Sequence, residues 1–553
     1  MIISRFSIVG LVVLLLSLAG NAQRVYAPNS VLSAGNWYQL GVTGEGVYKI
    51  TAASLAQAGI ISGTVSSNSI RLFGNGGAML SENNRIPRAD DLVENAIEMV
   101  DGGDGVFNGT DYLLFYAPGP HPWLRDSVTG LWKHQTNLYS DTAFYYLTIG
   151  GNGRRITAQS NQPAPTVTVR EMDDRFFQEL ELENLLSSGK SWLGTKLGAQ
   201  PGQSLSATLS LPFSLLNTQQ PITLISRLAA RSVGASTNFK WIYQNKIVQE
   251  LSLPAVSGQF LETYATQQQK QTQFLPAASG TVSLQLQMES GNPAAVGWID
   301  WVEVFARRQL AFSGSTTLFF RDVQSVAPGA VAAFEMQQAP AGGVFVWDIT
   351  QPSAPIKMNV TQTGNQVQWV NGASALREYV AALPTSLPEP FLLRKISNQN
   401  LHNSSPVQML IVTQTGLLPE ANRLADYHRT KDGLTVFVAT TEQIYHEFAG
   451  GNPDPTAVRD FVKMYYDKAN ISGGVRPEYL LLFGSGSFDH KRKKIKEANL
   501  VPVYESPESF DPLLTYTSDD FFGLLDDRED VNAMLPSDGL DIAIGRLPAG
   551  NIA

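Results

Sequence analysis

The sequence of 553 residues contains no cysteine. This absence excludes disulfide bonds, and it excludes thiolate ligands for a structural zinc ion. It also excludes a complete cysteine enzyme within these residues, because the thiolate is the nucleophile in that chemistry. The folded chain must therefore be stabilised by ordinary hydrophobic cores, which a chain of this length can supply as about three or four domains.

Histidine and clustered basic residues are also sparse. The six histidines form no H-x-x-x-H or other zinc pattern, and His428 is predicted to pack on a helix face. The net charge is −9, whereas a nucleic-acid surface would show a basic excess. The one basic run, at residues 491–496, has acidic neighbours and is interpreted as a solvated loop. The composition thus argues against a metalloenzyme and against a nucleic-acid partner.

Apolar runs of membrane-spanning length, about 20 residues, are absent. A shorter apolar run at residues 8–16 follows Arg5 and precedes small residues that end at Ala22. This pattern predicts a secretory signal peptide at residues 1–22, cleaved between Ala22 and Gln23. The alternative is a retained N-terminal anchor. We expect an exported protein that is peripherally held at the outer surface or released from it.

Residues 23–400 are rich in small and polar residues, and their apolar residues alternate in short runs between turn signals. The alternation is clear at residues 37–42, 206–211 and 281–286. Alternation with a period of two places every second side chain in a core, which is typical of β-sandwiches. This part of the chain is therefore predicted to be all-β.

Interruptions of the alternating pattern suggest the domain boundaries. The stretch at residues 161–165 is polar and proline-rich, and the aromatic strand predicted at residues 297–305 is of the kind that closes a sandwich. We expect a β-rich N-terminal domain at residues 23–170, a sandwich-like domain at residues 171–310, and a small β module with a linker at residues 311–400.

From residue 401 onward, short continuous apolar runs alternate with helical patterns, which indicates an α/β domain. Pro419 and the pair Asp454-Pro455 predict the starts of two helices, and Gly433 predicts the end of the first. Right-handed crossovers would build an open parallel sheet with its ligand site at the carboxyl ends of the strands. The strands are predicted at residues 407–412, 434–438, 479–483 and 540–544.

The last predicted strand lies close to residue 553, and no closing helix follows it. An open sheet that stops at its fourth strand leaves apolar strand faces in water. We therefore expect residues 401–553 to form the first part of a truncated α/β domain, with strand edges that favour aggregation.

The polar turn at residues 484–489 follows the third predicted strand, where an open α/β sheet displays functional groups. Gly484 and Gly486 permit a tight turn, and Asp489 is predicted either to orient a catalytic group or to cap the next segment. An ordinary glycine turn is the alternative. A serine nucleophile is disfavoured, because the sequence GSGSF lacks the final glycine of a G-x-S-x-G elbow.

Two oxygen-rich stretches are candidates for a structural Ca²⁺ site. Residues 101–111 space their acidic residues with glycines but lack the distal glutamate of an EF-hand, and the alternative is a pair of tight turns. Residues 517–530 gather carboxylates around an aromatic pair without EF-hand spacing, and the alternative is a solvated acidic loop. The candidate ligands are Asp101, Asp104, Asp111, Asp519, Asp520 and Asp526.

Several phrases in this sequence, read together, resemble the gingipain-type cysteine peptidases and, among them, the sortases of type IX secretion. The order and spacing of the phrases carry the resemblance, which spans nearly the whole chain after residue 22. One departure is Ser485, where the family commonly has an acidic residue. The main phrases are WYQLGVTGEGVYKIT at 37–51, GWIDWVEVFARRQL at 297–310, YLLLFGSGSFDHK at 479–491, YTSDDFFGLLDD at 516–527 and LDIAIGRLPAGN at 540–551.

The resemblance implies a caspase-like peptidase domain in which a histidine and then a cysteine act as base and nucleophile. Both would lie beyond the strand predicted at residues 540–544. The resemblance therefore implies an N-terminal portion without catalytic residues, inactive alone and requiring no cofactor for chemistry.

The resemblance also implies a role for the parent protein at the cell surface. Such a sortase removes C-terminal sorting domains from exported cargo and joins the cargo to surface lipopolysaccharide. Its partners would be that cargo and outer-membrane secretion components. The alternative is a non-catalytic exported β-sandwich protein that binds glycan or partner proteins at the outer surface.

Overall fold

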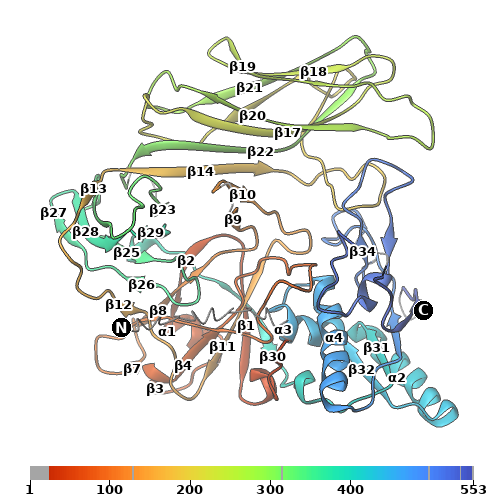
Figure 1. Ribbon diagram of the computed structural model, residues 1–553. Coiled ribbons are helices and arrows are strands. Elements are labelled where there is room, and N and C mark those ends of the chain that lie inside the picture. Colours follow the sequence, from red (N-terminus) through yellow and green to blue (C-terminus); the bar gives the residue numbers. More distant parts are fainter. Residues whose placement is uncertain (1–23, 127–129, 313–315, 496–498, 536, 551–553) are drawn as a thin grey trace, which may run out of the picture.

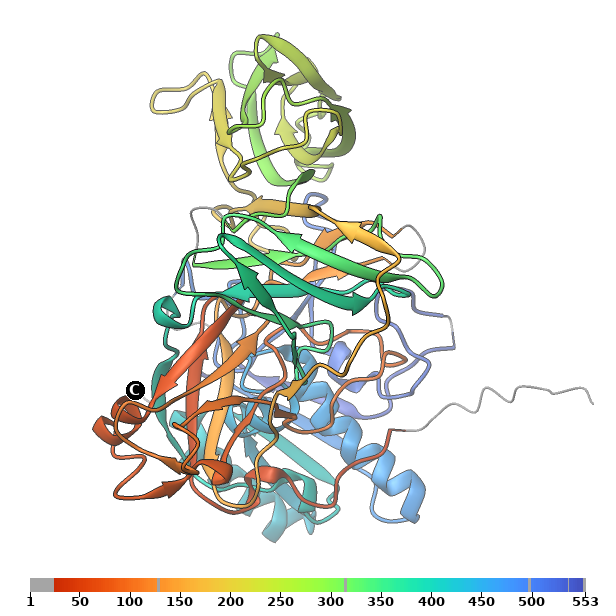
Figure 2. The same cartoon turned by 90° about the vertical axis from the view of Figure 1, so that its left-hand side faces the viewer.

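The computed structural model describes residues 24–126, 130–312, 316–495, 499–535 and 537–550. The predicted signal peptide at 1–22 and its cleavage site at Ala22 and Gln23 lie outside the described residues. The described chain forms three β-rich modules and one α/β module, with the sandwich projecting from one end (Figures 1 and 2). Within the described ranges, no helix is both long and apolar enough to cross a membrane.

The N-terminal module consists of antiparallel sheets around one core. The helix α1 (Ala52–Gln57) is capped by Thr51, whose side chain accepts a hydrogen bond from the amide of Ser54. One sheet has the order β30 (Phe391–Ile396), β1 (Trp37–Val42), β11 (Ala143–Ile149), β4 (Ile70–Phe73) and β5 (Glu94–Asn95). The others are β2 (Gly46–Thr51), β8 (Tyr112–Ala117) and β6 (Glu98–Val100), the pair β3 (Val65–Ser66) and β7 (Val106–Phe107), and the hairpin β9 (Trp123–Arg125) and β10 (Trp132–His134).

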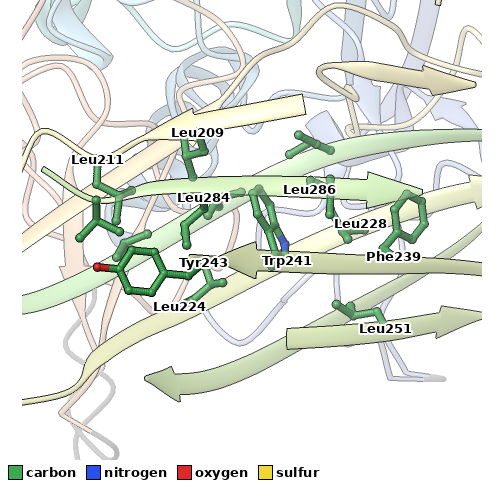
Figure 3. Close-up of a cluster of buried hydrophobic side chains, with 14 of the residues drawn as sticks. Leu209, Leu211, Leu224, Leu228, Phe239, Trp241, Tyr243, Leu251, Leu284 and Leu286 are labelled. Carbon is green, nitrogen blue, oxygen red and sulfur yellow. The ribbon is translucent and has the colours of Figure 1, made fainter. Parts of the chain in front are cut away.

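The sandwich module has two antiparallel sheets, as the alternating pattern predicts. Leu284, Leu286, Phe239 and Trp241 point into its core and are buried (Figure 3). One sheet has the order β14 (Glu171–Glu179), β22 (Val296–Gln309), β17 (Ile222–Arg231) and β20 (Thr266–Phe274), with β15 (Lys196–Gly198) also on β22. The other has the order β16 (Ser206–Ser210), β21 (Ser283–Ser290), β18 (Thr237–Tyr243) and β19 (Lys246–Leu253).

The third module is formed by residues that both precede and follow the sandwich in sequence. Phe334 stacks on Trp369 in its core, with ring centroids 5.0 Å apart. One sheet has the order β12 (Thr157–Ala158), β26 (Ile356–Lys357), β25 (Phe345–Asp348), β29 (Tyr379–Ala382) and β23 (Thr317–Phe320). The other has the order β13 (Val167–Val169), β24 (Val331–Met336), β28 (Gln366–Gly372) and β27 (Thr361–Thr363).

The polar stretch at residues 161–165 connects β12 to β13 inside this third module. Residues 157–169, which the sequence places in a domain at 23–170, pair with strands from residues 331–357. Proline and polar residues are equally compatible with a connection between two sheets of one module and with a linker between domains. The chain therefore leaves the third module to form the sandwich and then returns.

The α/β module has a fully parallel sheet with the order β32 (Val436–Thr440), β31 (Met409–Thr413), β33 (Tyr479–Phe483) and β36 (Ala543–Leu547). Its helices are α2 (Leu418–Tyr427), α3 (Thr441–Phe448) and α4 (Pro455–Ser472), and a small ladder joins β34 (Tyr504–Glu505) to β35 (Thr517–Ser518). The remaining short helical turns are η1 (Val31–Ser33), η2 (Ser67–Ser69), η3 (Pro384–Ser386), η4 (Leu401–Asn403), η5 (Thr415–Leu417), η6 (His428–Asp432) and η7 (Asp520–Gly523).

The predicted helix signals in the α/β module are confirmed. Asp454 caps α4 by accepting a hydrogen bond from the amide of Thr456, and Pro455 is its first residue. Gly433 ends the turn after α2 in the left-handed region, at φ +68°. His428, predicted to pack on a helix face, is half-buried and pairs with Asp432. It lies in the π-helix η6, beyond the end of α2.

Helix α4 joins the α/β module to the N-terminal module through a buried carboxylate. Asp460, whose side chain is 6% exposed, accepts hydrogen bonds from Arg24 Nη1 at 2.7 Å, Arg88 Nη2 at 2.7 Å and Arg88 Nε at 2.6 Å. Burial acts to raise its pKa, but the charges of Arg88 and Arg24 keep the pKa of Asp460 below its ordinary value. In Figure 2 the first described residues run past this helix.

A buried histidine joins the N-terminal module to the sandwich. His134 of β10 is 3% exposed at its side chain, and it lies between Glu303 Oε1 at 2.6 Å and Glu179 Oε2 at 2.9 Å. Its ring stacks on Phe177, and the ring of Trp301 meets it edge-on. Burial acts to lower its pKa, but hydrogen bonds to the two carboxylates raise the pKa of His134 above its ordinary value.

This geometry predicts a loss of stability at alkaline pH. Because the pKa of His134 is raised on folding, its stabilising effect is complete below the pKa of the unfolded state and is lost as pH rises through the folded pKa. We expect the difference in unfolding free energy between the wild type and His134→Gln to fall by about 1 kcal/mol from about pH 6 to about pH 9. Urea unfolding at both pH values measures it, and an equal difference at both would contradict the assignment.

Candidate functional site

The carboxyl ends of the four parallel strands meet at one edge of the α/β sheet, which is where sheets of this kind carry ligand sites. Thr413 ends β31, and its hydroxyl donates to the carbonyl of Phe483 at the end of β33 at 2.9 Å. Thr440 ends β32 and caps α3 by accepting from the amide of Gln443. The carboxyl ends of the strands are thus held in place by hydrogen bonds of the strand residues themselves.

The turn at residues 484–489 has a structural role. Gly484 has φ +155°, and a Cβ there would lie 2.8 Å from Val501, so glycine is required. Asp489 is buried and accepts hydrogen bonds from the amides of Lys493, Lys494 and Ile495. Of the two predicted roles for Asp489, capping of the next segment is the one that the structure supports.

The serines of this turn are used in its own hydrogen bonds. The amide of Ser485 donates to the carbonyl of Ala549, and Ser487 Oγ accepts from the amide of Asp489 at 3.1 Å. Neither serine is hydrogen-bonded to a histidine among the described residues. The turn therefore offers no activated nucleophile.

A cavity of about 660 Å³ lies beside the carboxyl ends of β31 and β32. His446 is buried in its wall, with Nδ1 2.7 Å from the hydroxyl of Tyr146, which also accepts from Gln39 at 3.2 Å. The lining residues come from both the N-terminal and the α/β modules: Gln39, Phe144, Leu393, Arg394, Gln414, Thr415, Thr441, Glu442, Tyr445, His446, Gly451 and Arg492. The cavity can bind polar groups but holds no thiol.

The described part of the basic run, residues 491–495, is exposed except at Lys491. Lys491 is buried and pairs with Asp141 and Glu181 at 2.6 Å, and Lys493 pairs with Glu181 at 2.9 Å. Both carboxylates lie outside the α/β module, so the interpretation from sequence is wrong for Lys491, whereas Lys493 is exposed. The positive charges fix the loop after β33 against the β-rich modules.

The acidic residues at 101–111 serve their own turns. Asp101 accepts from the amide of Gly103, Asp104 from that of Val106, and Asp111 from that of Asn108. The nearby hydroxyl of Ser67 and the hydrogen bond from the Gly103 amide hold the pKa of Asp101 below its ordinary value. The structure does not bring these three carboxylates together in a metal-sized group among the described residues.

The second acidic stretch is split by the fold. Asp519 forms two hydrogen bonds with Arg546 of β36, at 2.7 and 2.8 Å, while Asp520 is exposed at the start of η7. Asp526 alone of the predicted ligands joins a compact group, together with Glu529 and Asp541. One oxygen of each of these three carboxylates lies within 4.8 Å of the others.

The Asp526, Glu529 and Asp541 group, hereafter the oxygen cluster, is tied to helix α4. The hydroxyl of Tyr466 lies 2.8 Å from Asp541 Oδ1 and 3.1 Å from Asp526 Oδ1. Burial and then the charges of Asp541 and Asp526 raise the pKa of Glu529 to about 7. Oxygen ligands of this kind suit Ca²⁺, and calcium at the oxygen cluster stays a prediction.

The oxygen cluster predicts that Glu529→Gln stabilises the chain at alkaline pH. A carboxyl with a raised pKa contributes its stability below the unfolded pKa and loses it as pH rises through about 7. We therefore expect the free energy of unfolding of the variant to be about 1 kcal/mol larger than that of the wild type near pH 8 in the presence of a chelator. Near pH 4.5 the two free energies should be equal. Melting curves at the two pH values measure this.

Calcium gives the control for this prediction. If the oxygen cluster binds Ca²⁺, added calcium raises the melting temperature of the wild type near pH 8 and leaves that of Glu529→Gln unchanged. An equal rise in both proteins would place the bound ion elsewhere, and a destabilised variant in the chelator would contradict the raised pKa.

Comparisons with known proteins agree with this arrangement of modules. Residues 402–553 match the family model described as Peptidase family C25. The crystal structure of dimeric latent PorU from Porphyromonas gingivalis matches with a TM-score of 0.79 and 24% identity, over 95% of this chain and 49% of the PorU chain. This chain thus spans about half the length of that protein.

A carbohydrate-binding module, CBM36 in complex with calcium and xylotriose, aligns with a TM-score of 0.15 and 13% identity over 23% of this chain and 98% of the module. No curated protein matches the sequence.

The predicted order of β-rich modules followed by a caspase-like α/β domain is confirmed by the match to PorU. The C25 match falls on the α/β module and includes the oxygen cluster and the turn at 484–489. Residues 402–553 are therefore similar to peptidase family C25, and the chain has the fold of PorU over nearly its whole length.

Proposed function

We propose that this chain is the N-terminal portion of a gingipain-type cysteine endopeptidase that acts as a sortase. The parent protein would remove C-terminal sorting domains from type IX secretion cargo and attach the cargo to the cell surface. The observation that carries the proposal is the coincidence of the C25 match with the α/β module inside a chain of PorU-like fold.

The chemistry of the proposed reaction requires groups that these 553 residues do not supply. A cysteine thiolate attacks the scissile carbonyl, a histidine protonates the leaving amine of the sorting domain, and a thioester to the cargo forms. An amine on the surface lipopolysaccharide then attacks the thioester and releases the thiolate. With no cysteine in its sequence, this chain cannot perform the first step alone.

In this proposal, the role of this chain is to position the parallel sheet of the α/β module. The turn at 484–489 and the loop held by Lys491 fix the carboxyl ends of the strands, and the β-rich modules cover that edge. The same modules would present the surface for cargo and for outer-membrane secretion components. The signal-like residues 1–22 support export to the outer surface, and the net charge of −9 argues against nucleic acid as a partner.

The proposal predicts that the purified chain is catalytically silent. We expect no labelling by a peptide-derived thiol-reactive inhibitor and no peptide cleavage, because the required thiolate is missing. Mass spectrometry after incubation with the inhibitor checks the labelling. Cleavage inherent to this chain would contradict the assignment of the chemistry to a cysteine outside it.

A second measurement tests the family assignment itself. The coding DNA downstream of the codon for residue 553 is expected to encode a G-H-G-like segment followed by a cysteine. A chain extended through that cysteine should be labelled by the same inhibitor, and its Cys→Ala variant should not. If the downstream DNA encodes no such pair, the peptidase proposal fails and a non-catalytic surface protein is favoured.

A further inference from the structure

A second cavity, of about 430 Å³, lies between the first described residues, the loop at 84–90 and the helices α3 and α4. Its volume is in the range of small-molecule sites, which often lie between domains. It is separate from the cavity at the sheet edge, with which it shares no lining residue. The lining residues are Arg24, Val25, Tyr26, Asn84, Arg85, Pro87, Arg88, Ala89, Asp90, Phe448, Asp460 and Asp527.

One wall of this cavity carries a buried donor without an acceptor. Arg24 uses Nη1 on Asp460, and its Nη2 is buried with no hydrogen-bond partner in the described part of the chain. Arg88, in contrast, is fully committed to Asp460 and to the carbonyl of Ser81. A buried N–H group that lacks an acceptor is costly, so the Arg24 donor favours a ligand that brings one.

The charge in the cavity that is not neutralised by an ion pair is positive. Arg85 donates from Nε to the carbonyl of Arg528 at 3.1 Å, and its two terminal nitrogens have no hydrogen-bond partner among the described residues. The acidic lining residues, in contrast, all have cationic partners: Asp460 pairs with the two arginines above, Asp527 with Lys463 at 2.7 Å, and Asp90 with His402 at 3.1 Å. An anion can therefore bind between Arg24 and Arg85 without displacing an existing ion pair.

A buried acceptor without a donor lines the same cavity. Asn84 is 4% exposed and donates from its amide nitrogen to the carbonyls of Leu524 and Asp526. Its Oδ1 is buried and has no partner within the described residues. A ligand N–H group would satisfy it. The remaining lining is apolar, with Val25, Pro87 and Phe448 among its members.

We propose that this cavity binds a small organic carboxylate with an apolar body and an amide N–H group, such as an N-acylated amino acid or the C-terminal residue of a peptide. The carboxylate pairs with Arg24 and Arg85, the N–H donates to Asn84, and the apolar body packs on Phe448. The site does not depend on the sortase proposal, since its residues lie away from the sheet edge.

Isothermal titration with N-acetyl-leucine and its uncharged analogue N-acetyl-leucinamide tests this inference. We expect saturable binding of the carboxylate and at least a tenfold weaker affinity for the amide. Arg85→Ala should weaken binding of N-acetyl-leucine at least fivefold. Arg24→Lys keeps a cation beside Asp460 but removes Nη2. It should also weaken binding of N-acetyl-leucine at least fivefold, without a large change in melting temperature. Arg423→Ala, at an exposed site on α2, is the matched control and should bind like the wild type.

A pentapeptide ending in leucine distinguishes the two sources of the carboxylate. Binding of the peptide as tight as that of N-acetyl-leucine identifies a peptide end as a ligand, and exclusion of the peptide restricts the site to small molecules. Equal affinity for the acid and the amide, or full affinity in Arg85→Ala, would overturn the proposal. Displacement of N-acetyl-leucine by sulfate at a similar concentration would reduce the site to a general anion site and would also overturn it.

Discussion

The carboxylate of Asp460 is the contact on which the arrangement of the whole chain depends. It lies on α4 of the α/β module, yet its hydrogen-bond donors are Arg24 and Arg88 of the N-terminal module. A buried carboxylate needs such partners, because an unpaired charge in that position costs several kcal/mol, on the order of 3 to 5. The two modules must therefore fold against each other, and the parallel sheet is placed by residues that precede it by more than 300 positions.

This dependence explains why the β-rich modules belong to the candidate site. The sheet-edge cavity takes a third of its lining residues from the N-terminal module, and the loop after β33 is held by Asp141 and Glu181. These contacts thus shape the open end of the parallel sheet independently of any catalytic group. A peptidase built on this half would have a preformed platform, with the thiol and its base supplied by other residues.

The local signals in the sequence predicted the elements well, and the contacts between distant segments could not be predicted. Asp454 and Pro455 define the start of α4 because capping depends only on neighbouring residues. The fourth strand was predicted at 540–544 and lies at Ala543–Leu547, because Asp541 instead bonds to Tyr466 and the amide of Leu525. Likewise, nothing in the spacing of Asp526 and Asp541 indicates that the chain brings them together.

The most direct test of this account is a double-mutant cycle between Arg88 and Asp460, measured by native-state hydrogen exchange in β31 and β33. Asp460→Asn, Arg88→Met and the double variant give the coupling energy, and the exposed pair Glu420 and Arg423 on α2 is the reference. We expect a coupling of about 3 kcal/mol for the buried pair, against about 0.3 kcal/mol for the reference. Similar values for the two pairs would show that the Arg88–Asp460 contact contributes no more to the stability of the α/β sheet than a surface ion pair, and would contradict the dependence on Asp460.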